Sequence, residues 1–211
     1  TPLANLQLHV DLLQRNPGDG DAVLRYGAVL SSEIGRLAQL AENAISVAKG
    51  GMNKRRLEVA VPDDSVRDVV GRFTPILVES GCAVVLACNA SAPCCFDKTS
   101  WEACLINLID NARKYAPGAP IEVATSQTAG EVRMDVTDHG PGIAPKDAEQ
   151  IFEPLERGSG AAVAGFGLGL AAVRTLAQQN GGACWVEAAQ PGARFVVIMK
   201  VGPVPAEGHR C

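Results

Sequence analysis

The sequence lacks the features that would place it in several common classes of protein. No apolar run approaches the roughly 18 residues that a membrane-spanning helix requires. No signal peptide and no initiating methionine are present, so we expect an excised fragment from the cytoplasm. The formal net charge of −4 argues against nucleic acid as the main partner, because nucleic-acid binding requires a basic surface.

Metal-binding patterns are also missing from the seven cysteines. They form no Cys-x-x-Cys pair, and none is spaced with histidine as in a zinc site. Most of them lie in apolar runs, where cysteine behaves as a small buried hydrophobic residue. A reducing compartment is therefore the simpler inference, and the vicinal pair Cys94-Cys95 leaves a redox switch as the alternative.

The 211 residues, 47% of them hydrophobic, suffice for one good core and a smaller module. Residues 1–16 are predicted to form a helix and residues 21–48 a second one, separated by a turn that contains proline and glycine. The first helix has the 3-4-3 apolar spacing of a coiled-coil seam, at Leu3, Leu6, Val10 and Leu13. The second continues such a stripe, at Leu30, Ile34, Leu37, Ala41, Ala44 and Ala48.

Two such helices joined by a short turn make an antiparallel hairpin, and one hairpin cannot cover both of its apolar seams. Pairing with a second copy into a four-helix bundle would cover them, so we favour a homodimer. A hairpin that packs on its own globular domain is the alternative.

Beyond residue 54 the pattern changes to alternating strands and helices. Strands are predicted at 57–61, 83–87, 121–125, 132–137, 184–188 and 194–201. Helices are predicted from about 64 to 77, after Asp97, and at 168–179, with a carboxylate at 63 or 64 as a cap for the first of them. This order predicts an α+β fold, a two-layer sandwich with a mostly antiparallel sheet under helices on one face, preceded by the helical hairpin.

The stretch 101–117, WEACLINLIDNARKYAP, separates into two helical faces. The apolar face, which would pack on a sheet, contains Trp101, Leu105, Leu108 and Ala112. The polar face contains Asn107, Asn111 and Lys114. Two carboxamides and an ammonium at this spacing suit a hard cation that bridges phosphate oxygens. An amphipathic helix with a solvated polar face would give the same pattern.

The next motif, Asp138-His139-Gly140-Pro141-Gly142, directly follows a predicted strand. Glycine at 140 and 142 lets the backbone approach a flat ligand without a Cβ clash. Asp138 can accept a hydrogen bond from an exocyclic amine, which favours adenine over guanine. A simple Gly-Pro turn is the alternative.

A second glycine motif, Gly165-Phe166-Gly167-Leu168-Gly169-Leu170, opens a helix. It follows the small-residue run 158–165, which we read as a mobile loop that closes over a ligand. Its backbone N–H groups and the helix N-terminus suit a phosphate. A Rossmann fold is excluded, because no βαβ unit has an acidic residue about 20 positions further on.

Four motifs in this order, NLIDNARKYAP, DHGPGI, IFEPLERG and GFGLGL, resemble the N, G1, F and G2 boxes of bacterial sensor histidine kinases. These kinases belong to the wider gyrase, chaperone, kinase and mismatch-repair (GHKL) ATPase group, and the resemblance covers nearly all of residues 50–201. The start, TPLANLQ, resembles the end of the family's H box, His-Glu-x-x-Thr-Pro-Leu. The resemblance implies a dimerisation hairpin at 1–50, an ATP-binding catalytic domain of GHKL type at 51–203, and a tail at 204–211.

The resemblance also implies ATP and Mg²⁺ as cofactors, with a role for each matching residue. Asn111 would be the Mg²⁺ ligand, and Asn107 would support the phosphates or the hydrated ion. Lys114 would contact phosphate and Tyr115 would line the pocket. Asp138 would bind the adenine amine.

The glycine boxes would complete the nucleotide site. Gly140 and Gly142 would shape the base pocket. The hinge of the loop and its phosphate contact would come from Gly165, Gly167, Leu168 and Gly169. Phe152 and Arg157 would anchor the loop or reach the phosphates.

The function that the resemblance implies is donation of the ATP γ-phosphoryl group to a histidine and then to a response regulator. Asn107 stands where hydrolysing members carry glutamate, and a carboxamide cannot act as a base. A GHKL ATPase, a serine protein kinase and a non-catalytic nucleotide-binding regulatory module are the alternatives.

The accepting histidine of the H box lies four residues before its threonine, and this chain begins at Thr1. We therefore predict that the fragment binds ATP but cannot autophosphorylate, and we interpret His9 as a residue at the edge of the seam. Thr1 lies where the family places a polar residue that assists phosphatase activity. The expected setting is the cytoplasmic portion of a bacterial sensor anchored in the inner membrane by its missing N-terminal part.

Overall fold

The computed structural model describes residues 2–15, 18–49, 55–156 and 167–205, and the chain divides into two compact units, residues 1–45 and 46–211. The first unit is built from α1 (Pro2–Arg15) and most of α2 (Gly20–Lys49). Both predicted helices are confirmed. Asp19 fixes the start of α2, because its side chain accepts a hydrogen bond from the N–H of Ala22 at 3.0 Å.

The hairpin leaves apolar surface uncovered. His9 of α1 packs edge to face on Tyr26 of α2, with 5.9 Å between the ring centroids. Several large apolar side chains of the two helices are nevertheless exposed, namely Leu8, Val10, Val23, Leu24, Ile34 and Ile45. None of the helices in the described ranges has a stretch long and apolar enough to cross a membrane.

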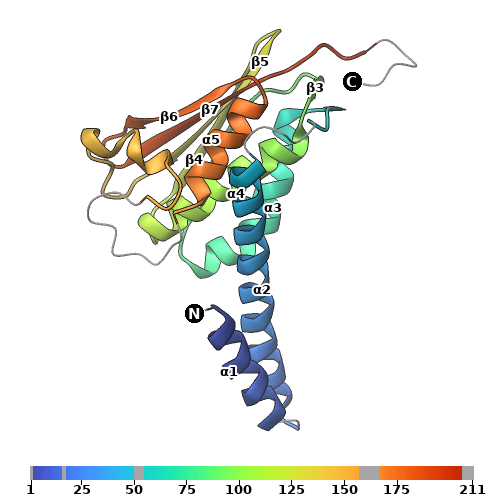
Figure 1. Ribbon diagram of the computed structural model, residues 1–211, viewed down its shortest axis with the longest axis vertical. Helices are drawn as coiled ribbons and strands as arrows, with labels where there is room; N and C mark the ends of the chain where they lie inside the picture. The colour runs from blue at the N-terminus through green and yellow to red at the C-terminus, as the bar shows by residue number, and fades with distance from the viewer. Residues whose placement is uncertain (1, 16–17, 50–54, 157–166, 206–211) are drawn as a thin grey trace. The chain divides into compact units, whose positions relative to one another are not determined.

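The second unit is a five-stranded sheet with helices on one face (Figure 1). Its strands, in spatial order, are β2 (Val84–Asn89), β4 (Ile121–Gln127), β5 (Glu131–Asp138), β7 (Ala193–Lys200) and β6 (Ala183–Ala188). Only β2 and β4 are parallel, and the other neighbours are antiparallel. The predicted two-layer α+β sandwich is therefore confirmed.

A smaller two-stranded sheet joins β1 (Glu58–Ala60) to β3 (Cys94–Phe96). The sequence predicts β1 but misses β3. All three residues of β3 are buried, so no alternation of apolar and polar residues marks it as a strand.

The covering helices are α3 (Pro62–Glu79), α4 (Lys98–Tyr115) and α5 (Gly169–Gln179). Helix α4 contacts both other helices and the strands β4, β5 and β7. Its predicted apolar face is confirmed as core, with Trp101, Leu105, Leu108 and Ala112 all at most 2% exposed. Two short 3₁₀ turns, η1 (Pro145–Asp147) and η2 (Gln150–Phe152), lie between β5 and α5.

One face of the sheet is buried under the helices, and the other face is partly exposed to solvent. In β5, Met134 and Val136 are fully buried against the helices, whereas Arg133 and Asp135 are half-buried on the opposite face. The Arg133 guanidinium also lies over the ring of Trp185 in β6, 5.7 Å from its centroid, and the indole N–H of Trp185 donates to Glu187 at 2.8 Å.

The predicted cap at Asp97 is confirmed, because its Oδ1 accepts from the N–H of Ser100 at 2.9 Å. The predicted carboxylate cap of α3 is wrong. Asp63 is fully buried, and its carboxylate accepts hydrogen bonds from the N–H of Ala90 at 3.0 Å and from the hydroxyl of Thr125 at 2.5 Å. Asp63 therefore joins the start of α3 to the ends of β2 and β4 instead of satisfying its own helix.

The cysteines are mostly buried thiols. Cys82, Cys88, Cys94, Cys104 and Cys184 are free. Burial raises the pKa of Cys104 well above its usual value. Cys95 is disulfide-bonded, and because Cys94 is free the two vicinal cysteines do not bond to each other.

Candidate functional site

Asp138 is the last residue of β5, and its carboxylate is held by backbone donors on one side. The side chain is buried, and its Oδ1 accepts hydrogen bonds from the N–H groups of Gly140 at 2.9 Å and Ala193 at 3.3 Å. Ala193 faces Asp138 in the ladder between β5 and β7, so the sheet itself fixes this oxygen. Within the described residues Oδ2 accepts no hydrogen bond, which leaves it for an outside donor such as an exocyclic amine.

Gly140 and Gly142 follow Asp138 in a region too crowded for side chains. A Cβ on Gly140 would lie 3.0 Å from the carbonyl oxygen of Tyr115 and 3.1 Å from Oδ1 of Asp138. Gly142 has a φ of +75°, which other residues rarely adopt. The absence of these side chains keeps the C-terminal end of α4 close to the carboxylate.

A further glycine, Gly192, belongs to this part of the site and was missed from the sequence. Its φ is +100°, and a Cβ there would lie 1.8 Å from the carbonyl oxygen of Asp138. Its own carbonyl oxygen would meet a Cβ on Gly142 at 3.1 Å. The dipeptide Pro191-Gly192 signals a turn, but nothing in the sequence shows that this turn lies against Asp138.

Asn107 does not lie on a solvated helix face, which was the alternative that the helical pattern left open. It is 5% exposed, and its Nδ2 donates to the carbonyl of Ala103 at 2.9 Å. Its Oδ1 lies where it would meet a Cβ on Gly169 at 3.2 Å, so Asn107 faces the first residue of α5. Burial follows from α5, which packs on α4 and covers this position.

Asn111 and Lys114 remain at the surface of α4, but they differ in what they contact. Asn111 is half-buried, and within the described residues its carboxamide has no hydrogen-bond partner. Lys114 forms an ion pair with Asp110, which also accepts from Arg113 at 2.8 Å. Lys114, which was expected to contact phosphate, is therefore paired with a carboxylate of its own helix. Tyr115, at the end of α4, is 36% exposed.

The start of α5 presents backbone N–H groups without a side-chain cap. Leu168 is the residue before the helix, and its side chain makes no capping hydrogen bond. The first N–H groups of a helix have no partner within it, so they can bind an anion. Gly167, with a φ of +65°, accepts a hydrogen bond at its carbonyl from the N–H of Leu155 at 2.9 Å.

Phe152, which was expected to anchor the loop or to reach the phosphates, lies in the core. It is 2% exposed and packs edge to face on Phe195, with 6.4 Å between centroids. Three other predicted site residues lie outside the described residues, namely Thr1, Arg157 and Gly165.

These parts converge along one helix. The end of α4 meets Gly140 beside Asp138, and its middle meets Gly169 at the start of α5. Ala116 marks the contact with Gly140, and Asn107 marks the contact with Gly169. The two residues are nine positions apart, or about 13 Å along the helix. The arrangement therefore offers one amine-accepting end and one anion-binding end, with the carboxamide of Asn111 between them.

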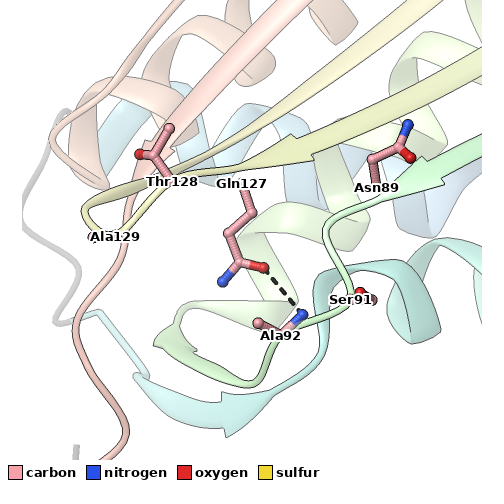
Figure 2. Close-up of a pocket in the computed structure, with 6 residues that line it drawn as sticks. All are labelled: Asn89, Ser91, Ala92, Gln127, Thr128 and Ala129. Carbon is pink, nitrogen blue, oxygen red and sulfur yellow. Dashed lines mark hydrogen bonds between the residues drawn. The ribbon is translucent and has the colours of Figure 1, made fainter.

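A separate hollow of about 360 Å³ lies at the far end of β4 and β5 (Figure 2). It is lined by Asn89, Ser91, Ala92, Gln127, Thr128 and Ala129, and the Ala92 N–H donates to Gln127 at 3.3 Å across it. Gln127 faces Val132 of β5, and Val132 lies six residues, or about 20 Å, from Asp138 at the end of that strand. The hollow contains none of the predicted site residues.

Comparison with known proteins identifies the class that this fold and site define. The model of the family described as histidine kinase-, DNA gyrase B-, and HSP90-like ATPase matches residues 96–203, just over half of the chain. The chain belongs to this ATPase family, and the matched residues form an ATP-binding domain. The match begins at β3 and includes α4, the Asp138 motif and α5.

Individual relatives narrow the likeness to sensor kinases. The sensor protein IrlS of Burkholderia pseudomallei is 29% identical over 209 residues, which cover 95% of this chain and 44% of IrlS. The histidine-protein kinase/phosphatase MprB of Mycobacterium avium is 36% identical over 121 residues, which cover 54% of this chain and 23% of MprB. The predicted resemblance to the C-terminal part of sensor histidine kinases is confirmed, and the chain spans less than half the length of either relative.

Solved structures agree on the fold. The histidine kinase AdeS of Acinetobacter baumannii superposes on this chain with a TM-score of 0.70 at 22% identity. The superposition covers 95% of this chain and 95% of AdeS. Full-length ShkA in complex with AMPPNP superposes with a TM-score of 0.74 at 25% identity, covering 96% of this chain and 44% of ShkA.

Proposed function

We propose that this chain is the ATP-binding catalytic core of a two-component sensor histidine kinase. In the parent protein it would donate the γ-phosphoryl group of ATP to a histidine just upstream of residue 1, and from there to the receiver domain of a response regulator. The observation that carries the proposal is the carboxylate of Asp138, held through Oδ1 by the sheet and open at Oδ2.

Asp138 would select adenine by accepting a hydrogen bond from its amine through Oδ2. Because the backbone N–H groups of Gly140 and Ala193 hold the other oxygen, the carboxylate is oriented before the ligand arrives. Gly140 and Gly142 let the end of α4 and the turn at Gly192 lie close to this carboxylate, and the base would meet backbone at these two positions.

The phosphates would bind between α4 and the start of α5. The uncapped N–H groups at Gly169 and Leu170 would contact them, with Asn107 directly behind. No group of three His, Cys, Asp or Glu side chains in the described residues could hold a metal, so Mg²⁺ would depend on phosphate oxygens and the carboxamide of Asn111. When bound, Mg²⁺ would neutralise charge on the transferring phosphoryl group.

Asn107 favours transfer to a protein over hydrolysis. A carboxamide cannot take a proton from water, so the site as built would hold ATP and not activate a water molecule. The name of MprB includes kinase and phosphatase, and the histidine kinase ThkA has been solved in complex with a response regulator. These names support the same class of activity here.

The hairpin would dimerise the parent protein. The exposed apolar side chains of α1 and α2, among them Leu8, Leu24 and Ile34, need a partner, and a second hairpin would supply one. The accepting histidine is absent from these 211 residues, so this chain would bind ATP without labelling itself. In the parent, Thr1 would assist dephosphorylation of the regulator, and a segment outside this chain would anchor the protein in the membrane.

The test is thermal unfolding with and without Mg²⁺ and a non-hydrolysable ATP analogue. At 100 times its dissociation constant, the analogue should stabilise the chain by about 2.7 kcal/mol. Asp138→Asn should remove this stabilisation, because an amide N–H₂ in place of Oδ2 would face the adenine amine. Asp64→Asn, at an exposed position of α3, should keep it.

A shift that survives in Asp138→Asn would refute the adenine site. For phosphotransfer, the parent chain with its H box should acquire acid-labile phosphate on histidine, and a parent that binds ATP without labelling would favour the regulatory-module alternative.

A further inference from the structure

Arg174 lies on α5, five residues beyond Gly169, and its guanidinium contacts two glutamates that precede α5 in the sequence. Its Nη1 donates to Oε1 of Glu153 at 2.7 Å. Its Nη2 lies 3.2 Å from Oε2 of Glu149 and 3.3 Å from the carbonyl oxygen of the same residue. One guanidinium therefore joins α5 to both sides of the 3₁₀ turn η2.

The same guanidinium covers the ring of Phe152, 5.0 Å from its centroid. Phe152 is buried against Phe195 of β7, so Arg174 closes the solvent side of a stack that is anchored in the sheet. Arg174 also adjoins Cys184 of β6. Burial raises the pKa of that thiol to about 11, although the guanidinium acts in the opposite direction.

This cluster is connected to the start of α5 by a short path. Leu155 is two residues beyond Glu153, has a φ of +68°, and donates its N–H to the carbonyl of Gly167 at 2.9 Å. A Cβ on Gly167 would lie 2.7 Å from the backbone of Leu155 and of Glu156, so the two segments are in direct contact. Arg174 thus contacts the segment 149–155, and this segment contacts Gly167.

We propose that Arg174 is a positioning residue for the phosphate-binding start of α5. It would act without contacting the nucleotide, by fixing the segment 149–155, which in turn contacts the backbone at Gly167 ahead of the helix. This inference rests on the proposed function for what the helix start binds.

The chemistry of the cluster calls for arginine in particular. Glu149 and Glu153 are 96% and 57% exposed, and ion pairs at such positions are individually weak. The planar guanidinium combines two of them with a stack on Phe152, which a lysine ammonium on its flexible stem cannot do. Lysine should therefore restore the contacts only in part.

The first experiment compares affinities for two ligands, Mg²⁺ with a non-hydrolysable ATP analogue, and adenosine. Methionine is unbranched and apolar and nearly as long as the arginine stem, so the side chain in Arg174→Met can still pack next to Phe152, and we expect this variant to fold with little change in Tm. It should bind the ATP analogue about fivefold more weakly, a loss typical of positioning effects, and adenosine unchanged. Arg174→Lys should recover part of the loss.

The matched control is Arg72→Met, which removes an exposed ion pair of the same length, 2.7 Å to Glu102, between α3 and α4. It should change neither affinity. An equal loss for both ligands in Arg174→Met would indicate general destabilisation and overturn the proposal, as would no loss for either ligand.

The second experiment needs no nucleotide. Amide hydrogen exchange should accelerate at Leu155 in Arg174→Met but not in Arg72→Met, because the Leu155 N–H is bonded to Gly167. Unchanged exchange at Leu155 would overturn the positioning role. If the wild-type chain bound no ATP analogue, the proposed function would fail, and accelerated exchange would still establish the link from Arg174 to the start of α5.

Discussion

The two ends of the candidate site are built in different ways. At the proposed adenine end, the Asp138 carboxylate accepts from the N–H of Ala193 in the neighbouring strand and from that of Gly140 in the turn that follows, and Gly192 lies directly against the Asp138 backbone. At the proposed phosphate end, an uncapped helix start meets one carboxamide, and the backbone at Leu155 and Glu156 contacts Gly167 just before it. Selectivity for the base would thus rest on the sheet, whereas phosphate binding would rest on how separate segments pack.

The largest expected effect comes from crowding the adenine end. Gly192→Ala would place a Cβ 1.8 Å from the carbonyl oxygen of Asp138 at a φ of +100°. Overpacking together with backbone strain should lower the free energy of unfolding by about 3 kcal/mol. Chemical denaturation measures this loss.

The control for that substitution is Gly130→Ala in the turn between β4 and β5, where a Cβ meets nothing within 4 Å. It should change the unfolding free energy by less than about 1 kcal/mol. Equal effects of the two substitutions would contradict the view that the adenine end is the rigid one.

A smaller effect is expected from crowding the phosphate end. Gly169→Ala would bring a Cβ to 3.2 Å from Oδ1 of Asn107, which must move by a few tenths of an ångström. We expect the ATP analogue to bind about fivefold more weakly, about 1 kcal/mol, with adenosine unaffected. Calorimetric titration of both ligands measures the difference, and Gly71→Ala, a helical glycine of α3 with open space, is the control.

The smallest effect is expected at Lys114. Its ammonium already forms an ion pair with Asp110. Exchanging Asp110 for a phosphate would therefore add only the difference between the two interaction energies to the binding free energy. Lys114→Met should weaken binding of the ATP analogue by about two- to threefold, and less at high salt. A tenfold loss would mean that the ammonium leaves Asp110 entirely when the ligand binds.

The sequence predicts the parts of the molecule whose signals are local. The apolar face of α4 follows from helical periodicity, the cap at Asp97 from its position before the helix, and the strand that ends at Asp138 from alternation. Each of these depends on neighbours within a few residues.

The missed features depend on partners that are distant in the sequence. Asn107 is buried because α5 covers it, and Asp63 is satisfied by Ala90 and Thr125 and not by its own helix. Gly192 looks like any turn glycine until the ladder places it against Asp138. Periodicity shows which face of an element is apolar, but it does not show what that face will meet.

The two tryptophans of the chain lie in different surroundings, which gives the protein two optical probes of its own. Trp101 on α4 is fully buried, packs edge to face on Phe96, and its indole N–H has no partner in the described residues. Trp185 is half-buried on the partly exposed face of the sheet and bonded to Glu187. Trp101 should therefore emit at the shorter wavelength. Replacing Trp185 with phenylalanine would leave a fluorescence signal from the core under α4, and replacing Trp101 would leave a signal from the edge strand β6.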